Sequence, residues 1–424
     1  MRRLISEIRE NLGGQVTLYG WVHRIRHLGR ISFVLLRDCS GMVQLVLEAK
    51  PEFTLESVLH VRGGVQQNQK APGGIEVQVE ELEVISLAAP DLPLAVNQAL
   101  ETVALDTILD HRTVSLRHPK ILSVFRLQSD ILKHYSSYMR SEGFTEIKTS
   151  KLIGTGTEGG TGLFPVSYFD RKVFLAQSPQ FYKQAMVASG LEKVFEIGNA
   201  YRAEKHDTPR HLNEYVSLDV EAAFIDNEHD LMDLETRILK SVFAGIRADD
   251  ADILATWKAA VPDPEQFDGV PRLTYDEARE IVARREDKRV FDITPEGERV
   301  LCEWAQETSG IDAVFVFAFP RRKRPFYTFP TDGNKTMSFD LLFRGLEITT
   351  GGRRIHDYQM LVESIEKFGM STEELADYLA IFRYGCPPHG GFAIGLERLT
   401  QKILGLSNVR EASLFPRDRK RIRP

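Results

Sequence analysis

The residues best suited to chemistry lie in segment 195–221, FEIGNAYRAEKHDTPRHLNEYVSLDVE. Apolar residues on both sides predict two strands that enclose a polar loop, with Arg202 and Glu204 at its start and Arg210 and His211 near its end. An arginine at the end of a buried strand can hold a phosphate, while a glutamate two residues later can accept hydrogen bonds from an uncharged part of the ligand. The loop is therefore predicted to bind a phosphorylated ligand. The alternative is a solvated ion pair between Arg202 and Glu204.

A second group of charged residues lies in segment 340–354, DLLFRGLEITTGGRR. Asp340 and Glu347 are expected on one strand and its continuation, where two carboxylates can share Mg²⁺ with phosphate oxygens. The two glycines that follow are expected to let Arg354 turn into the same pocket. The alternative is a set of surface charges at a sheet edge.

Two further segments each carry one cation. In segment 390–399, GGFAIGLERL, glycines precede a predicted helix with a lone Arg398, so that backbone and guanidinium can approach a flat ligand closely. Segment 177–184, QSPQFYKQ, contains Lys183. A lysine and an arginine that converge on one small pocket would bind a side-chain carboxylate. A helical lysine is usually solvated, so this segment is a weak signal by itself.

Segment 154–162, GTGTEGGTG, has five glycines in nine residues. So much glycine without a repeat predicts a mobile lid over a site, and Glu158 within it could reach a substrate ammonium group. The alternative is a plain flexible linker.

Composition restricts the class of protein. The chain has 424 residues, 42% of them hydrophobic and 27% charged, which is typical of a globular protein with two or more domains. Its net charge of −6 argues against a protein that coats nucleic acid indiscriminately. The three cysteines form no CxxC pair, and no apolar segment is long enough to span a membrane, so we expect a cytoplasmic protein without a zinc site.

The region 15–88 is predicted to form a small five-stranded barrel of the OB type. Tyr19, Trp21 and His23 should share the outer face of the first strand, where aromatic rings beside arginines suit unpaired bases. The alternative is a half-buried sheet with a few exposed aromatic residues. The strands are expected at 15–26, 31–37, 42–48, 57–66 and 74–86.

The rest of the chain follows a Pro-containing segment, 89–117, that we interpret as a hinge. Apolar spacing predicts a helix at 121–141 and then a strand at 144–149, and the apolar run 313–319 predicts a buried strand. Strand patterns dominate the segments that carry the charged residues. We therefore expect an antiparallel sheet flanked by helices, and an α+β fold class for the whole chain.

These segments resemble motifs 2 and 3 of the class II aminoacyl-tRNA synthetases. An OB barrel before a class II core is the layout of class IIb, which contains the aspartyl-, asparaginyl- and lysyl-tRNA synthetases. The strings QSPQxYKQ, RAExHxxxRHLNE, FDLLxRGxEIxxGGxRIH and YGxPPHGGFxIGxERL look like those of archaeal-type aspartyl enzymes. The likeness covers nearly the whole chain. It implies an anticodon-binding domain at 1–88, a hinge at 89–117 and a catalytic domain at 118–424.

The resemblance also implies an activity and its residues. The activity is ATP-dependent attachment of L-aspartate to tRNA(Asp) through an aspartyl-adenylate, with Mg²⁺. Arg202, Glu204 and Arg398 are expected to be catalytic, with Arg202 at the α-phosphate and the other two at the adenine. The aspartate site would contain Glu158, Gln180, Lys183, Thr350 and Arg354, and the ATP site would add Arg210, His211 and Glu347. Asp340 and Glu347 would hold Mg²⁺, and His23, Phe33, Gln44, Pro72 and Glu76 would contact tRNA.

The choice of amino acid rests on Lys183. Asparaginyl enzymes are similar but lack a lysine at the matching position, which leaves asparaginyl-tRNA synthetase as the nearest alternative. We expect aspartate to be preferred because a neutral amide would leave Lys183 and Arg354 as two unpaired buried cations. A second alternative is an RNA-binding paralogue without catalysis, which should have lost some of Arg202, Glu347, Lys183 and Arg398, whereas all four are present. A third is an ATP-dependent asparagine synthetase of the same core fold, which would not need the predicted barrel.

The choice of tRNA rests on His23 and Pro72. This combination resembles enzymes that charge both tRNA(Asp) and tRNA(Asn), whereas enzymes restricted to tRNA(Asp) tend to have Trp and Lys at these positions. An enzyme that attaches aspartate to both tRNAs implies a tRNA-dependent amidotransferase, which converts the aspartate carried by tRNA(Asn) to asparagine. The alternative is a discriminating enzyme. The class also implies a homodimer through motif 1, where Ser150 replaces the usual proline.

Overall fold

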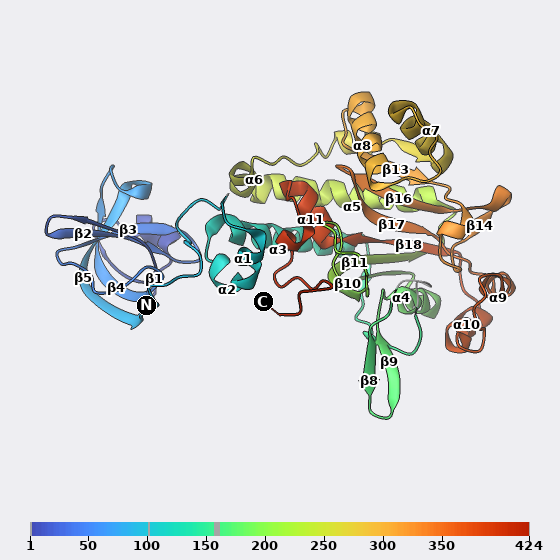
Figure 1. Ribbon diagram of the computed structural model, residues 1–424, viewed down its shortest axis with the longest axis horizontal. Coiled ribbons are helices and arrows are strands. Elements are labelled where there is room, and N and C mark those ends of the chain that lie inside the picture. The colour runs from blue at the N-terminus through green and yellow to red at the C-terminus, as the bar shows by residue number, and fades with distance from the viewer. Residues whose placement is uncertain (1, 101, 157–161, 424) are drawn as a thin grey trace. The chain divides into compact units, whose positions relative to one another are not determined.

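The computed structural model describes residues 2–100, 102–156 and 162–423. The chain divides into two compact units, Met1–His118 and Pro119–Pro424 (Figure 1). Each has its own hydrophobic core. Within the described ranges, no helix is both long enough and apolar enough to cross a lipid bilayer.

The first unit is built on a closed five-stranded barrel, drawn in blue in Figure 1. Neighbouring strands follow the order β1-β2-β3-β5-β4, and β3 with β5 is the parallel pair. Alternate apolar residues such as Val16 and Leu18 are buried inside it. The predicted OB-type barrel is confirmed, with each strand within two residues of its expected bounds. The strands span Gln15–Leu28 (β1), Ile31–Arg37 (β2), Met42–Leu47 (β3), Val58–Gln67 (β4) and Ile75–Ser86 (β5).

The first strand departs from simple alternation at His23. A β-bulge interrupts the pairing of β1 with β2 there, so His23 is an extra residue and turns inward. It is only 8% exposed, and its Nδ1 accepts a hydrogen bond from Nη1 of Arg37 (2.9 Å), which in turn pairs with Glu56. Burial, together with the charge of Arg37, lowers the pKa of His23 to about 4. The expectation that His23 shares an outer face with the two aromatic residues before it is therefore wrong.

The segment interpreted as a hinge, 89–117, lies within the first unit and contains two short helices, α1 (Leu105–Asp110) and α2 (Arg112–Ser115). Near its end, Nη1 of Arg117 lies 3.3 Å from Oε2 of Glu56, the buried carboxylate on the barrel. The segment is thus attached to the barrel by an ion pair beside the bulge.

The second unit is built on an eight-stranded sheet in the order β12-β13-β16-β17-β18-β11-β10-β6. Its neighbouring strands are antiparallel except for β12 with β13 and β10 with β6. Together with the flanking helices, this confirms the predicted antiparallel sheet flanked by helices and the α+β class. The strands span Thr145–Glu146 (β6), Lys193–Tyr201 (β10), Glu214–Ala223 (β11), Arg272–Thr274 (β12), Ala313–Phe317 (β13), Ser338–Phe343 (β16), Leu346–Arg353 (β17) and His389–Gly395 (β18).

The largest core lies between this sheet and three helices, α3 (Pro119–Ser141), α5 (Glu228–Asp249) and α11 (Leu396–Leu404). Helix α3 matches the predicted helix 121–141. The strand predicted at 144–149 is reduced to β6, because only two of its residues pair with β10 at the edge of the sheet.

Smaller elements surround the sheet. Helix α8 (Pro295–Ser309) begins with a proline after the capping residue Thr294, and Gly310 follows its last residue with a φ of 75° that suits glycine. The remaining helices are Gln180–Met186 (α4), Ala251–Trp257 (α6), Tyr275–Glu286 (α7), Tyr358–Lys367 (α9) and Ala376–Arg383 (α10). The remaining strands are Leu152–Ile153 (β7), Pro165–Tyr168 (β8), Arg171–Leu175 (β9), Pro330–Thr331 (β14) and Lys335–Thr336 (β15).

The contact between α3 and α5 generates a prediction for stability. A Cβ atom on Gly245 would lie 2.3 Å from Nδ1 of His134. Gly245→Ala should therefore lower the melting temperature, because overpacking costs about 1–3 kcal/mol and outweighs the roughly 1 kcal/mol that alanine gains in helix propensity. Thermal unfolding measures this. Adding His134→Ala should restore stability, and an unchanged melting temperature of the single variant would contradict the close packing.

Candidate active site

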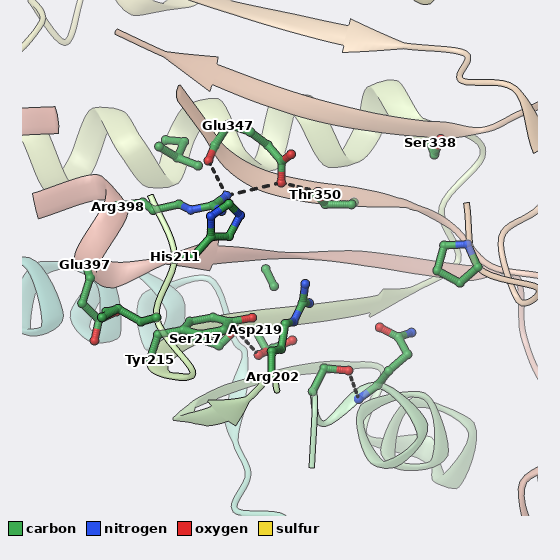
Figure 2. A pocket seen from close by; sticks show the side chains of 18 of the residues that line it. Arg202, His211, Tyr215, Ser217, Asp219, Ser338, Glu347, Thr350, Glu397 and Arg398 are labelled. Atoms are coloured by element: carbon green, nitrogen blue, oxygen red, sulfur yellow. Dashed lines mark hydrogen bonds and ion pairs between the residues drawn. The ribbon is translucent and has the colours of Figure 1, made fainter. Parts of the chain in front are cut away.

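A cavity of about 170 Å³ in the second unit is lined by residues of β11, β17 and β18 (Figure 2). Strand β11 shows how the sequence produces it. Ser217 and Asp219 line the cavity, whereas the alternate residues Leu218 and Val220 lie in the hydrophobic core. The sheet therefore separates a polar face from an apolar one.

The structure brings most of the predicted site residues to this cavity. Asp340 does not line it but pairs with Arg324, which does. Glu158 lies outside the described residues, as does most of the predicted lid. The predicted residues that line the cavity are Gln180, Lys183, Arg202, Glu204, Arg210, His211, Glu347, Thr350, Arg354 and Arg398.

Lys183 and Arg354 lie close to two carboxylates. Nζ of Lys183 lies 3.0 Å from Oδ1 of Asp219 and 3.3 Å from Oε2 of Glu221, and Nε of Arg354 donates to Oε1 of Glu221 (3.1 Å). All four residues are at least nine-tenths buried. Burial alone would raise the pKa of Glu221, but Arg354 and Lys183 hold it below its usual value. The expectation that asparagine would leave two unpaired cations is therefore wrong, since the four charges already balance.

Gln180 adds an unused donor to this group. Its Oε1 accepts from Nη2 of Arg354 (3.3 Å), which orients the amide. Its Nε2 is buried and has no hydrogen-bond partner within the described part of the chain. A buried unpaired donor costs about 1–3 kcal/mol, so its position in the cavity lining suggests an acceptor atom on a ligand.

A chain of neutral hydrogen bonds lies behind Arg354. Nε2 of Gln184 donates to Nε2 of His389 (2.8 Å), and the hydroxyl of Tyr378 donates to Oε1 of Gln184 (3.0 Å). Nδ1 of His389 donates to the carbonyl of Pro387 (2.8 Å), and burial lowers the pKa of His389 to about 4. The carbonyl of His389 accepts from the backbone N–H of Arg354 (2.9 Å). Sequence reasoning missed these supporting residues, because lone buried polar residues have no distinctive spacing.

The predicted phosphate-binding loop connects β10 to β11, which pair antiparallel as expected. Nδ2 of Asn213 donates to the carbonyls of Arg202 (2.8 Å) and Glu204 (3.3 Å) and so ties the start of the loop to its end. The guanidinium of Arg202 lies 5.8 Å from the ring centre of Tyr215. These contacts give Arg202 a defined position at the cavity.

The two predicted magnesium ligands lie on a hairpin rather than on one strand and its continuation. Asp340 on β16 pairs with Thr350 on β17, and Glu347 lies near the start of β17 beyond a bulge. Oγ1 of Thr350 donates to Oε1 of Glu347 (3.0 Å). The two glycines before Arg353 lie within β17 and not at a turn, and Arg354, which follows this strand, lines the cavity as expected.

The carboxylates of the hairpin titrate as an interacting pair. Burial raises the pKa of Asp340 to about 6, with the charge of Arg324 opposing and that of Glu347 adding to this rise. The pKa of Glu347 is lowered, because Arg398 and Arg324 outweigh the effect of burial. Oδ1 of Asp340 is buried without a hydrogen-bond partner among the residues described. Two carboxylates with an unused oxygen fit Mg²⁺, which usually takes one or two carboxylates plus phosphate oxygens and water.

Arg398 on α11 lies beside Glu347, and Figure 2 shows His211 next to them. Nη1 of Arg398 donates to the carbonyl of Glu347 (2.8 Å) and lies 3.6 Å from its Oε1. Burial and the charge of Arg398 lower the pKa of His211, whose Nδ1 lies 2.6 Å from Oγ1 of Thr208. A neutral ring and a guanidinium thus line this side of the cavity.

Sequence reasoning missed Glu298 on α8. Its Oε2 pairs with Nη2 of Arg210 and accepts from the backbone N–H of Glu347 (3.0 Å). One buried carboxylate therefore connects the phosphate-binding loop to the hairpin. In the sequence, an acidic residue in the first turn of a helix suggests only a favourable interaction with the helix dipole.

The C-terminal segment also holds this loop. Asn213 donates its backbone N–H to the carbonyl of Arg417 (2.8 Å), and Val409 donates to the carbonyl of Pro209 (2.9 Å). Arg410 pairs with Asp207 at the tip of the loop. Segment 409–417 therefore holds the loop through backbone hydrogen bonds and an ion pair inside the second unit.

The predicted tRNA-contacting residues lie in the barrel. Gln44 of β3 and Glu76 of β5 occupy paired positions, and Nε2 of Gln44 donates to Oε2 of Glu76 (2.9 Å). Phe33 is part of the neighbouring strand β2. Pro72 begins the short turn before β5, whereas His23 is buried at the bulge.

Two family profiles match the chain. The profile of class II tRNA synthetases (D, K and N) matches residues 104–419, and that of the OB-fold nucleic acid binding domain matches residues 16–85. The chain belongs to the class II tRNA synthetases. This family accounts for the eight-stranded core, and the OB-fold profile accounts for the barrel that precedes it.

Individual relatives match this synthetase over its whole length. The aspartate–tRNA(Asp/Asn) ligase of Thermus thermophilus is 47% identical over 100% of both chains, and that of Archaeoglobus fulgidus is 43% identical with the same coverage. The aspartate–tRNA(Asp) ligase of Pyrococcus horikoshii is 43% identical over 99% of this chain and 98% of its own. The names of these relatives agree on aspartate and differ on the range of tRNA.

Solved structures agree on the fold. An asparaginyl-tRNA synthetase from Pyrococcus horikoshii, complexed with asparaginyl-adenylate, superposes with a TM-score of 0.91 at 31% identity and covers 100% of both chains. The aspartyl-tRNA synthetase of Entamoeba histolytica gives a TM-score of 0.87 at 30% identity over 100% of this chain and 93% of its own. The fold alone therefore does not separate the two amino acids.

The position of Glu298 generates a testable prediction. Glu298→Ala should lower the melting temperature and speed amide exchange in loop 204–213, because it leaves Arg210 and the backbone N–H of Glu347 without their shared acceptor. Thermal unfolding and hydrogen exchange measure the two effects. The matched control is Glu296→Ala in the same helix, whose pair with Arg299 is exposed and should be worth less than about 1 kcal/mol. Equal effects of the two variants would contradict the connecting role.

Proposed function

We propose that this chain is an aspartate–tRNA ligase that activates L-aspartate with ATP and transfers it to tRNA. The observation that carries the proposal is a single cavity that combines Lys183 and Arg354 with Arg202 and Arg398 in a class II core. The first pair suits the side-chain carboxylate of an amino acid, and the second pair suits a nucleotide. Full-length relatives named as aspartate ligases support this choice.

The first step forms the adenylate. An oxygen of the aspartate α-carboxylate attacks the α-phosphorus of ATP, the bond to the β-phosphate oxygen breaks, and pyrophosphate leaves. Arg202 stabilises the negative charge that develops on the α-phosphate, which is worth roughly 10²–10³ in rate for one such donor. Glu204 and Arg398 hold the adenine, and Arg210 and His211 face the distal phosphates.

The family as a whole uses ATP and generally Mg²⁺. In this chain Asp340 and Glu347 would hold Mg²⁺, which neutralises phosphate charge when bound. The unused oxygen of Asp340 and the hydrogen bond from Thr350 to Glu347 support that assignment. Within the described ranges, no group of three or more His, Cys, Asp or Glu side chains is placed to hold a metal ion. Phosphate oxygens would therefore complete the coordination.

Aspartate is selected by the type of hydrogen bond rather than by unpaired charge. The amino-acid end of the cavity is lined by Lys183 and Arg354, and Nε2 of Gln180 adds an unused donor there. Both oxygens of a carboxylate accept, whereas an amide brings a donor NH₂ group against these donors. Thr350 and Glu158 complete the aspartate site in this proposal, with Glu158 at the ammonium group. Asparaginyl-tRNA synthetase is the second candidate, and the buried Lys183 opposes it.

We further propose that the enzyme charges both tRNA(Asp) and tRNA(Asn). His23 and Pro72 carry this proposal, and relatives named as tRNA(Asp/Asn) ligases support it. Because His23 is buried at the bulge, it acts through the shape of β1, whereas Pro72 lies in an exposed turn. Phe33, Gln44 and Glu76 contact the anticodon. The mischarged product requires a tRNA-dependent amidotransferase.

The domain assignment and the oligomeric state are part of the same proposal. The barrel at 1–88 reads the anticodon, 89–117 links it to the catalytic domain at 118–424, and motif 1 forms a homodimer. Ser150 stands where the class has proline, and its hydroxyl accepts from the backbone N–H of Leu152 (3.2 Å). A local turn of this kind fixes the chain without a proline.

The proposal predicts aspartate charging of both tRNA transcripts at rates within about an order of magnitude, because one base contact is worth roughly 1–3 kcal/mol and its absence removes most selectivity. Aminoacylation assays with each transcript measure this. His23→Trp together with Pro72→Lys should restore preference for tRNA(Asp), with Pro72→Lys alone as the milder control. A wild-type preference of about 100-fold for tRNA(Asp) would contradict the relaxed range, and failure to charge either tRNA with aspartate would contradict the enzyme assignment.

A further inference from the structure

Arg324 is a buried cation at the cavity that the predicted site did not include. It follows the short turn Arg321–Lys323 and lines the cavity. Its side chain is 8% exposed, and its guanidinium carbon lies 3.7 Å from the ring centre of Phe319. A guanidinium held against an aromatic face in this way has little freedom to move.

The hydrogen bonds of Arg324 are incomplete. Nη2 lies 2.7 Å from Oδ2 of Asp340, which forms an ion pair. Neither Nε nor Nη2 has a partner with hydrogen-bond geometry in the part of the chain that the structure describes. A buried guanidinium with unused donors in a cavity lining calls for an anion that can accept from it.

Among the residues that the structure describes, Arg324 has one ion-pair partner, Asp340, which belongs to the hairpin that would hold Mg²⁺. If Mg²⁺ takes Asp340, the guanidinium must exchange its carboxylate for another anion or remain as a buried unpaired charge. The amino-acid end has its own balanced set of four charges around Lys183 and Arg354. The anion is therefore expected from the nucleotide, and a phosphate matches the planar fork of a guanidinium.

We propose that Arg324 binds the β- and γ-phosphates of ATP, and the pyrophosphate formed from them, in exchange for its contact with Asp340. The proposal rests on the proposed function, since it assigns a further contact within the same nucleotide site. Arg202 would then act at the α-phosphate, and Arg324 at the leaving group. In the absence of nucleotide, Asp340 and Arg324 neutralise each other.

Equilibrium binding to the full-length protein tests this proposal. Arg324→Met should weaken binding of ATP and of pyrophosphate by about 10- to 100-fold, the range expected for hydrogen bonds to a charged group, and change AMP binding by less than about twofold. Arg324→Lys keeps the charge but not the fork and should lie between wild type and Arg324→Met. Arg322→Met is the matched control, because Arg322 is an exposed residue of the same turn.

Each measurement is made with Mg²⁺ and with EDTA. A loss of ATP affinity that is larger with Mg²⁺ than with EDTA supports the exchange, because Asp340 stays paired with Arg324 when no Mg²⁺ is present. A loss that is equal or larger in EDTA overturns it. Equal weakening of AMP also overturns it, as does unchanged ATP affinity in folded Arg324→Met. If Arg324→Met does not fold, wild-type affinity of Arg324→Lys for both ATP and pyrophosphate overturns it. Wild-type protein that binds no ATP would instead contradict the proposed function itself.

Discussion

The structure of the catalytic unit depends on four buried charges that must stay paired. Lys183, Asp219, Glu221 and Arg354 come from a helix, two positions of β11 and the end of β17, and each is at least nine-tenths buried. Removing one partner from such a group is expected to cost about 3–5 kcal/mol, because another charge is left without compensation. The group therefore fixes α4, β11 and the end of β17 relative to one another, and with them the amino-acid end of the cavity.

The sheet is shaped so that this group can form. A Cβ atom on Gly391 would lie 2.0 Å from the carbonyl of Val220 and 2.3 Å from Oε2 of Glu221, so only glycine lets β18 pass beside the buried carboxylate. The carbonyl of Gly391 then accepts from Nη2 of Arg354 (2.9 Å). At the other end of the cavity, Glu298 and the C-terminal segment hold the phosphate-binding loop. Arg354 and Arg210 are thus each oriented by a carboxylate of the surrounding fold.

The sequence predicts the parts of this architecture that rest on local patterns. Alternation of apolar residues located the barrel strands and the pair β10 and β11, and the clustered charges located most of the charged residues that line the cavity. The sequence does not predict the structural features that depend on contacts between distant segments. The bulge that buries His23 depends on pairing with β2, and the carboxylate partners of Lys183 lie 36 and 38 positions along the chain. Arg324 and Glu298 belong to segments with ordinary charge patterns, so only the fold reveals that they meet Asp340 and Arg210.

The central claim is that the paired group around Lys183 and Arg354, with the free donor of Gln180, accepts a carboxylate and rejects an amide. ATP–pyrophosphate exchange with aspartate and with asparagine tests it most directly, since it measures the activation step without tRNA. Sites built to bind one polar group reject the analogue that lacks it by about 10⁴–10⁵, so kcat/KM should favour aspartate by roughly that factor. Comparable exchange with asparagine would contradict the claim and favour the asparaginyl alternative.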